Sequence, residues 1–342
     1  MQSRVATLVN VAEKAGVSVM TASRALAGSG YVSKATLAKV LVAADELGYV
    51  PNLQARSMKG GKTNVVGVML SNLQSTVVNE IASAVSAEVR KAGMDLVICD
   101  SVDMFSVGKR EGMHALLRGV CDGMIFIMPG FDNDYIQNLE RNGSPTVLIN
   151  YRRAKTALPV ICGDNKLGSG KAVKYLLDIG HRRIGFIRGS LYSGQSAERE
   201  AGYLNALHAA GIPEDPTLIV DGDFSRESGN AAGLKLLALA ERPTAVFAAN
   251  DEMAFGVIDE LQRCGLTVPK DMSVIGFDDI SASRSIHPSL TTIRQPLTKL
   301  AEVAVRELIA RIQGGGDGIG FVEFPSEFIV RESTAPPMAG AA

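Results

Sequence analysis

The stretch VSVMTASRAL, residues 17–26, decides how the rest of this chain is interpreted. Ser18 can cap a helix here, because its hydroxyl can accept a backbone N–H of the first turn. Ala22 and Leu26 are four residues apart and share one face, which leaves the other side chains of the helix pointing elsewhere. A short helix with so narrow an apolar face needs neighbouring helices to pack against, and its remaining side chains are expected to be exposed.

A second helix is predicted immediately upstream. Thr7 can cap it, the helix spans Leu8–Ala15 with an apolar stripe, and Gly16 ends it. Two helices joined by a tight turn that contains glycine predict a helix-turn-helix. An ordinary αα-hairpin is the alternative for these residues taken alone.

The residues of this pattern resemble the DNA-reading unit of the LacI/GalR (lactose-repressor) family. The matching residues are Thr7-Leu8, Val11-Ala12, Ala15-Gly16-Val17-Ser18, Thr21-Ala22-Ser23-Arg24 and Leu26. The N-terminal position and the match along residues 5 to about 333 support the resemblance over a plain hairpin. It implies that Thr7, Ser18, Val19, Met20, Thr21, Ser23 and Arg24 contact DNA.

Charge is distributed unevenly along the 342 residues, which are too many for one typical domain. Residues 1–62 hold eight Lys and Arg against three acidic residues, a net charge of +5, whereas the remainder has a net charge of −6. A basic head on an acidic body is typical of a nucleic-acid reader attached to another kind of domain.

Beyond the reading helix, Ser33 can cap a third helix whose apolar residues recur at helical spacing up to Gly48, so residues 1–50 form the predicted head. Residues 51–63 follow as a hinge or linker, because Pro51 disfavours a helical conformation for Val50. The family resemblance implies a hinge helix that inserts an apolar side chain into the minor groove. Its matched DNA-binding residues are Asn52, Ala55, Arg56 and Met58; a plain linker is the alternative.

From residue 64 the pattern changes to short apolar runs that alternate with amphipathic stretches. The predicted strands are 65–70, 96–99, 124–128, 146–149, 184–187, 218–220, 245–248 and 274–277, and the predicted helices are 80–91, 108–118, 171–178, 198–208, 228–240, 253–263 and 299–312. Nearly continuous apolarity indicates strands covered on both faces, so we expect doubly wound parallel sheets. The number of units exceeds one comfortable sheet and favours two.

Polar residues follow the predicted strands: Ser71-Asn72, Asp100-Ser101, Asn150, Asp164, Arg188, Asn250-Asp251, Asp278-Asp279 and Gln295. Parallel sheets bind ligands beyond the carboxyl ends of their strands. Two facing sheets would therefore line a cleft, as in the two-lobed, periplasmic-binding-protein-like body of the LacI/GalR family. Family topology implies a body of residues 64–334, with lobe one at 64–162 and 293–320 and lobe two at 163–292 and 321–334, where 322–330 forms the last strand. Residues 335–342 are expected to be a disordered tail.

The resemblance also implies the residues that bind a small effector. Arg199 would hold ligand hydroxyls or a carboxylate, Asn250, Asp251 and Asp278 would contact hydroxyls, and Phe224 would pack on a ligand ring. Asn150 and Asp164 are further candidates, although each could simply cap a helix. In lobe one the matched pair is Val77-Val78, where many relatives carry aromatic residues. Arg188 and Arg152-Arg153 add positive charge near the strand ends and mildly favour an acidic effector such as a sugar acid.

Signals of other functions are absent. Gly163–Gly168 lacks the lysine of a phosphate-binding loop, no Gly-x-Ser-x-Gly elbow occurs, and the four histidines have no metal spacing. We therefore expect no catalytic residue, metal or cofactor. The four cysteines are too widely spaced for a zinc site, and we expect them to be reduced thiols. Without an apolar leader or a run of about 20 apolar residues, a cytoplasmic protein that makes no membrane contact is expected.

These observations predict a transcriptional regulator, a repressor of a metabolic operon. It would bind palindromic operator DNA as a homodimer. No leucine heptads follow Val330, which favours a dimer over a tetramer. A sugar or sugar acid between the lobes would control it. A solute-binding protein or an α/β enzyme with the same body are the alternatives.

Overall fold

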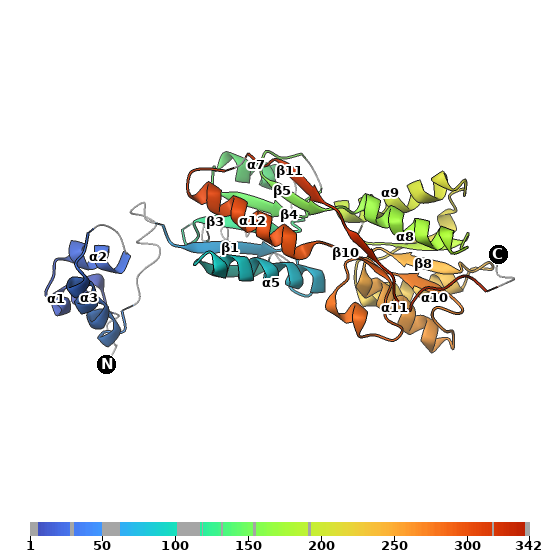
Figure 1. The fold of residues 1–342 in the computed structure, drawn as a ribbon, viewed down its shortest axis with the longest axis horizontal. Coiled ribbons are helices and arrows are strands. Elements are labelled where there is room, and N and C mark those ends of the chain that lie inside the picture. Colours follow the sequence, from blue (N-terminus) through green and yellow to red (C-terminus); the bar gives the residue numbers. More distant parts are fainter. Residues whose placement is uncertain are drawn as a thin grey trace. The chain divides into compact units, whose positions relative to one another are not determined.

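The computed structural model describes residues 6–27, 31–49, 62–100, 117, 119–130, 133–152, 155–190, 193–316 and 318–338. They fall into two compact units, which divide near residue 63 (Figure 1). The first is a helical head and the second an α/β body. No helix among the described residues is long and apolar enough to cross a membrane.

Three helices form the head: α1 (Leu8–Ala15), α2 (Val19–Ala27) and α3 (Lys34–Glu46). Thr7 and Asn10 form a capping box, and Gly16 ends α1 in the left-handed conformation at φ 68°. Small and β-branched side chains from all three helices make one core: Val11, Ala12, Ala22, Ala25, Val40, Ala43 and Ala44. The predicted helix-turn-helix is confirmed, and its alanines let the helices approach closely.

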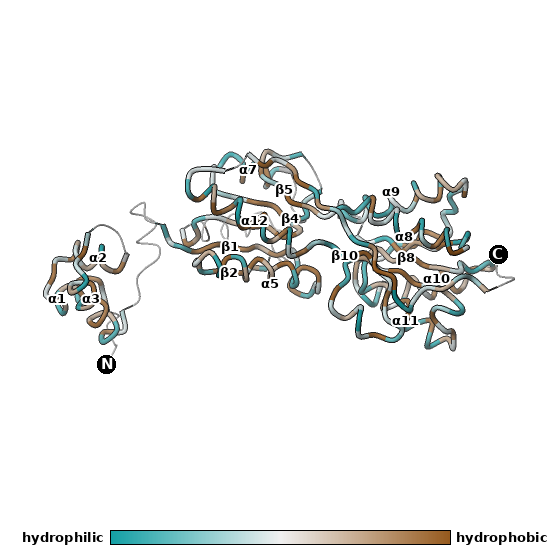
Figure 2. The backbone as a smooth tube through the Cα atoms, viewed as in Figure 1, coloured by the Kyte–Doolittle hydropathy of each residue, from teal (hydrophilic) through white to brown (hydrophobic). Residues whose placement is uncertain are grey.

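The first lobe of the body is built on a six-stranded parallel sheet in the order β11-β5-β4-β3-β1-β2. Its strands are β1 (Val65–Leu70), β2 (Asp95–Asp100), β3 (Gly123–Ile127), β4 (Thr146–Ile149), β5 (Val160–Gly163) and β11 (Phe321–Phe324). Its helices are α5 (Thr76–Lys91), α7 (Asn133–Arg141) and α12 (Leu297–Ile312). β1, β3, β4 and β5 are buried along their whole length, as expected for strands covered on both faces. β1 is accordingly drawn as hydrophobic in Figure 2.

The second lobe has a four-stranded parallel sheet in the order β7-β6-β8-β9. Its strands are β6 (Ile184–Arg188), β7 (Ile219–Asp221), β8 (Ala245–Ala248) and β9 (Ser273–Ile275). Its helices are α8 (Lys166–Asp178), α9 (Gly194–Ala209), α10 (Arg226–Leu237) and α11 (Asp251–Arg263). Two short helices, η1 (Pro216–Leu218) and η2 (Ser281–Arg284), complete the lobe. α8 and α9 cover one face and α10 and α11 the other (Figure 1). Successive residues of β6 face opposite sides of the sheet. Phe186 stacks on Tyr203 of α9, while Gly185 leaves room for Leu236 of α10.

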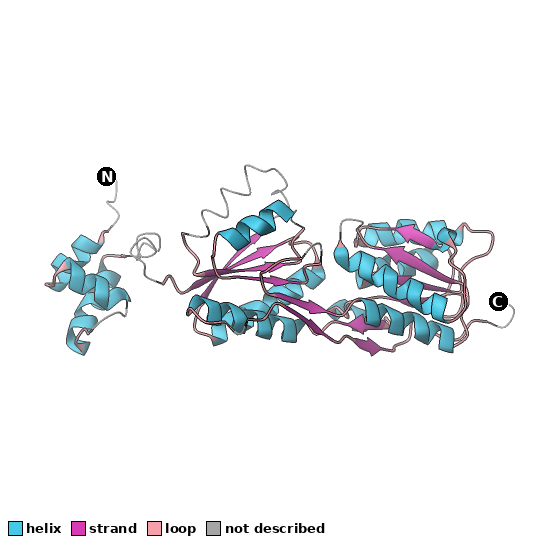
Figure 3. Ribbon diagram, turned by 90° about the horizontal axis from the view of Figure 1, so that it is seen from above, coloured by secondary structure: helices cyan, strands magenta, loops and turns pink. Residues whose placement is uncertain are grey.

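Short connecting strands join the lobes. β10 (Thr292–Arg294) pairs antiparallel with β12 (Glu327–Ile329) in a separate two-stranded sheet, and Figure 3 shows the two lobes as separate layered bodies. Neither β5 nor β10 was predicted from the sequence, and α7 was not predicted either. The predicted helix 108–118 lies, apart from Leu117, outside the described residues.

Two predictions about the C-terminal segment are wrong. The expected last strand 322–330 of lobe two is divided: β11 pairs with β5 in lobe one, and only β12 continues toward lobe two. Pro325 separates them because it has no N–H with which to continue a ladder. The tail does not begin at residue 335 either. The Ala335 carbonyl accepts from His181 Nε2 at 2.9 Å and Ser273 Oγ at 3.0 Å, and its N–H donates to the same hydroxyl.

Candidate functional site

In the head, helix α2 exposes three of its described side chains. Met20 is 64% exposed, Val19 is 42% exposed, and Arg24 is also exposed. Thr21 and Ser23 are half-buried. The exposed methionine and valine are not needed for the core, so they are available for another molecule.

Thr7 and Ser18 also cap the helices that follow them. The Ser18 hydroxyl accepts from the Thr21 N–H at 3.1 Å, and the Thr7 hydroxyl donates to Asn10 Oδ1 at 2.7 Å. Their first role is therefore to begin α2 and α1. Asn52, Ala55, Arg56 and Met58 lie outside the described residues.

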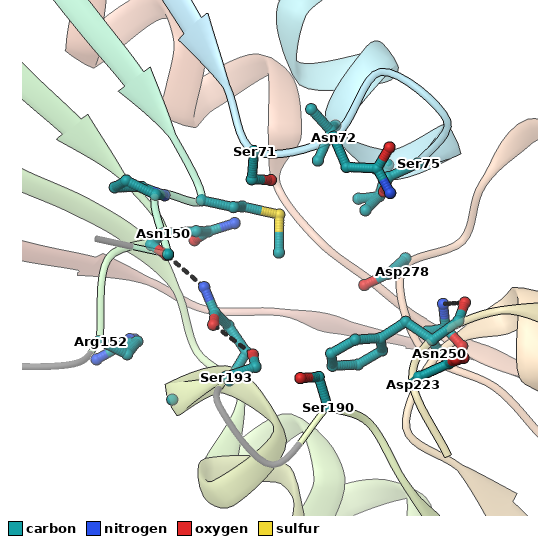
Figure 4. A pocket seen from close by; sticks show the side chains of 18 of the residues that line it. Ser71, Asn72, Ser75, Asn150, Arg152, Ser190, Ser193, Asp223, Asn250 and Asp278 are labelled. Atoms are coloured by element: carbon teal, nitrogen blue, oxygen red, sulfur yellow. Dashed lines mark hydrogen bonds between the residues drawn. The ribbon is translucent and has the colours of Figure 1, made fainter. Parts of the chain in front are cut away.

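A cleft of about 580 Å³ lies between the two lobes of the body. Figure 4 shows Ser71, Asn72 and Ser75 of lobe one along one wall, Asn150, Arg152 and Ser193 on a second side, and Asp223, Asn250 and Asp278 of lobe two opposite them. Apolar groups from both lobes complete the lining, among them Val77, Val78, Met128, Pro129 and Phe224. The mixture suits a small molecule with hydroxyl groups and an apolar face.

Seven of the nine predicted effector residues line this cleft: Val77, Val78, Asn150, Arg199, Phe224, Asn250 and Asp278. Asp164 and Asp251 do not, which corrects their assignment as ligand contacts. Asp164 is buried, and its Oδ1 accepts from the Leu167 N–H at 2.9 Å, so it caps the start of α8. This is the alternative that the sequence left open for it.

Asp251 is the first residue of α11 and does not line the cleft. It is fully buried and accepts from the Ile280 N–H at 2.9 Å, the Ser283 hydroxyl at 2.7 Å and the Thr292 hydroxyl. Burial, with the nearby Asp278 carboxylate, raises the pKa of Asp251 well above its ordinary value. Its role is to hold the loop that begins at Asp278.

Arg199 is a buried anchor and only 2% of it is exposed. Its Nε donates to Asn165 Oδ1 at 2.9 Å, its Nη1 to the Ala249 carbonyl, and its Nη2 to Asp278 Oδ1 at 3.1 Å. Its guanidinium lies 3.7 Å from the centroid of the Phe277 ring. Because these contacts occupy the planar fork, Arg199 orients Asp278 and presents little free charge to the cleft.

A chain of amides crosses from Asp278 to lobe one. Gln295 Nε2 donates to Asp278 Oδ1 at 2.6 Å, and Asn150 Nδ2 donates to Gln295 Oε1 at 3.3 Å. Gln195 Nε2 in turn donates to the Asn150 carbonyl. These bonds link α9, β4 and the crossover after β10 at the back of the cleft.

Backbone conformation also marks this site. Among the described residues other than glycine, six have positive φ, and four of them line the cleft: Met128 at 50°, Asn150 at 53°, Phe224 at 75° and Asp278 at 118°. Such conformations are costly for residues with a side chain and concentrate at binding sites. The clustering therefore points to function.

Several lining residues were not named as ligand contacts by the sequence analysis. They are Ser71, Asn72, Ser75, Met128, Pro129, Gly130, Arg152, Ser190, Ser193, Gly194, Gln195 and Asp223. Ser71 and Asn72 follow β1 directly and were expected at the cleft from the rule that ligands bind beyond strand ends; Ser190, two residues after β6, could have been found by the same rule. Gln195 sits inside a helix and carried no such signal.

Of the three arginines whose charge favoured an acidic effector, Arg152 lines the cleft but is paired with Glu198 and Glu323. Arg188 forms ion pairs with Glu200 at 2.6 Å and Asp221 at 3.0 Å, and it does not line the cleft. Arg153 lies outside the described residues. The positive charge inferred from the sequence is thus not free in this part of the structure.

Comparison with known proteins supports the two-part architecture. Residues 7–52 match the family model described as bacterial regulatory proteins, lacI family, and residues 173–334 match a periplasmic binding protein-like domain. The chain is 34% identical to the HTH-type transcriptional repressor CytR of Escherichia coli (strain K12), an alignment that covers 97% of each chain.

Solved structures agree with this result. The lac repressor dimer bound to operator and the anti-inducer ONPF aligns with a TM-score of 0.84 and 30% identity, covering 97% of this chain and 100% of that one. A complex of the transcriptional regulator CelR with cellobiose aligns with a TM-score of 0.73 and 32% identity, covering 96% of this chain and 99% of that one. Proteins of this family are transcriptional regulators and not enzymes. On these matches and on its helix-turn-helix head and two-lobed body, the chain belongs to the lacI family of bacterial regulatory proteins.

Proposed function

We propose that this protein is a cytoplasmic, homodimeric repressor of a metabolic operon, and that a sugar-like effector bound between its lobes controls its affinity for a palindromic operator. The observation that carries the proposal is the pairing of an exposed reading helix with a ligand cleft on one chain. Val19, Met20 and Arg24 of α2 are exposed although the head core is complete without them.

In this proposal α2 lies in the major groove. Arg24 is the candidate for a guanine, because its guanidinium can donate two hydrogen bonds to O6 and N7. Val19 and Met20 cannot donate hydrogen bonds through their side chains, so they would select by contact with thymine methyl groups. Asn52, Ala55, Arg56 and Met58 are proposed to contact the minor groove at the operator centre.

The effector proposal rests on the lining of the cleft. Asp278 and Asn250 offer an acceptor and an amide to hydroxyl groups, and Phe224, Val77 and Val78 offer apolar surface to the face of a ring. The related CelR structure holds a disaccharide, cellobiose, which supports a ligand of this class.

The experiment is selection of a binding site from random duplex DNA, followed by affinity measurements at several salt concentrations. We expect a two-fold symmetric site and an affinity that falls steeply with salt. Arg24→Ala should cost about 1 to 3 kcal/mol and relax the preference at one symmetric base position. Lys270→Ala, which removes an exposed positive charge from the body, should leave the affinity unchanged.

An equal loss across all sequences would make Arg24 a phosphate contact. Failure to enrich any symmetric site would contradict the proposed function itself.

A further inference from the structure

Arg152 forms part of the cleft wall between two carboxylates. It follows β4 in lobe one, only 9% of its side chain is exposed, and it lines the cleft beside Asn150 (Figure 4). Its Nη2 donates to the Gly163 carbonyl at 2.9 Å and to Glu323 of β11. Its Nε lies 3.2 Å from Glu198 Oε2, and its guanidinium lies 4.9 Å from the centroid of the Phe321 ring.

This cluster of Glu198, Arg152 and Glu323, hereafter the acidic clamp, has a formal net charge of −1. Glu198 belongs to α9 of lobe two and also accepts from Asn165 Nδ2 at 3.0 Å, so the ion pair with Arg152 joins the lobes. Burial opposes ionisation of Glu198 and raises its pKa, although Arg152 and Asn165 act in the other direction. A ligand that drew Arg152 away would therefore break a contact between the lobes.

The other arginine of the cleft lining is also neutralised. Arg199 is paired with Asp278, as described above. Asp223, in contrast, has no ion pair with a described cation. Its carboxylate accepts from the Ser225 N–H at 2.8 Å, and the bonds with Ser225 hold its pKa below the ordinary value. Both arginines are therefore paired with carboxylates, Arg152 with Glu198 and Glu323 and Arg199 with Asp278, while Asp223 adds a further negative charge to the lining.

We propose that Arg152, held in the acidic clamp, is a specificity-determining residue that restricts the cleft to uncharged ligands and excludes carboxylates and phosphates. The inference rests on the proposed role of the cleft as the effector site, and it selects a neutral hydroxylated molecule over a sugar acid. An anion entering the cleft meets no unpaired guanidinium among the described lining residues, and the formal charges of the lining side chains Arg152, Arg199, Asp223 and Asp278 sum to zero. Moving an anion from water into the cleft without a free cation would cost solvation free energy, because removing a charge from water is unfavourable unless it is paired.

The test removes the two carboxylates that neutralise Arg152, those of Glu198 and Glu323, and measures whether an anion then binds. Glu198→Gln/Glu323→Gln keeps the size of both side chains and their ability to accept from Arg152, but it leaves the guanidinium positive. Binding of inorganic phosphate and of D-glucuronate to the full chain is measured by calorimetry, with sodium chloride at matched ionic strength as the reference. We expect no saturable binding to the natural protein. The double variant should show saturable binding with an affinity at least about tenfold above the detection limit of the titration, which corresponds to a gain of at least about 1.4 kcal/mol.

Three variants assign the effect to the clamp. Adding Arg152→Gln to the double variant should abolish the gained binding, which also separates it from binding to the basic head. Glu241→Gln, an exposed glutamate of the same lobe as Glu198, should gain nothing. Glu323→Gln alone, whose side chain is 39% exposed, should gain part of the affinity and serves if the double variant does not fold.

Anion binding to the natural protein that Arg152→Gln abolishes would overturn the proposal, and so would a folded double variant that gains no anion affinity. Operator selection with the natural protein is scored separately, so failure of the charge restriction remains distinct from failure of the proposed regulatory function.

Discussion

The Arg199–Asp278 pair shows how one residue can serve both the fold and the cleft. Both side chains are almost completely buried, and each has further partners in Asn165, Ala249 and Gln295. Burial alone would lower the pKa of Arg199 and raise that of Asp278, and each charge offsets the shift of the other. The pair is thus stable only as a unit.

We therefore predict that Arg199→Ala destabilises the body by about 3 to 5 kcal/mol, because it leaves Asp278 buried without its cation. The double variant Arg199→Met/Asp278→Asn should recover a large part of that loss, since neither charge then remains. Urea unfolding of Arg199→Met, Asp278→Asn and the double variant measures the coupling energy. Strictly additive losses would show that the two side chains do not act as a pair.

His181 offers a residue-scale test of pH dependence. It is buried, its Nδ1 accepts from the Thr244 hydroxyl at 2.8 Å, and its Nε2 donates to the Ala335 carbonyl. Burial lowers its pKa below 6.5, and the bond to Ala335 only partly compensates. Below pH 6.5 the unfolded chain therefore takes up a proton that the folded protein does not.

The expected result is that the free energy of unfolding contributed by His181 is fully present above pH 6.5 and is lost as the pH falls toward the folded-state value. The slope from this one proton cannot exceed about 1.4 kcal/mol per pH unit. His181→Gln should flatten this part of the profile, whereas replacing the exposed His208 with Gln should not. An unchanged slope in His181→Gln would assign the acid sensitivity to other groups.

At the scale of elements, glycines set how closely the helices of lobe two pack. A Cβ on Gly256 of α11 would come within 2.1 Å of the Arg226 carbonyl oxygen, and one on Gly229 of α10 within 2.2 Å of the Met253 carbonyl oxygen. These contacts lie where α10 and α11 cross. Gly233, one turn further along α10, has ordinary space of 3.5 Å or more.

Substituting alanine at Gly256 and at Gly233 should therefore change the free energy of unfolding in opposite directions. Gly256→Ala forces the helices apart and should cost about 1 to 3 kcal/mol or more. Gly233→Ala meets no obstacle and should gain up to about 1 kcal/mol, because alanine loses less backbone entropy in a helix. Chemical denaturation of the two variants checks this. Equal effects would mean that packing at the crossing tolerates a methyl group.

At the scale of the whole molecule, the head and the body have separate cores. The head core consists of small side chains around Val11 and Val40, whereas the body core contains the aromatic and branched residues of both sheets. No residue is shared between these two clusters of buried side chains. Each unit therefore has the means to unfold by itself.

Differential scanning calorimetry of the full chain should show two transitions. Val40→Ala should weaken the head by about 2 kcal/mol and shift one transition only. Phe247→Ala should weaken the body by about 3 to 5 kcal/mol and shift the other. If either variant moved both transitions together, the two units would be energetically coupled.

The sequence by itself determined the elements whose signals are local. Thr7, Gly16, Ser18 and Ser33 mark helix ends through caps and turn conformations that depend on a few neighbouring residues, and the predicted head follows from them. Continuous apolar runs likewise identified most strands, because a strand buried on both faces has no polar side to display. Seven cleft residues could also be named, although through family resemblance and strand ends rather than through any local pattern.

Only the tertiary structure decided which charges are free and which segments belong together. Arg188, Arg152 and Arg199 look alike in the sequence, yet their carboxylate partners come from other elements, so their neutralisation cannot be read along the chain. For the same reason the sequence could not show that Asp251 is enclosed or that β11 pairs with β5 across more than 150 residues. Pairing and burial depend on distances in space, and local propensity carries no information about contacts between residues so far apart.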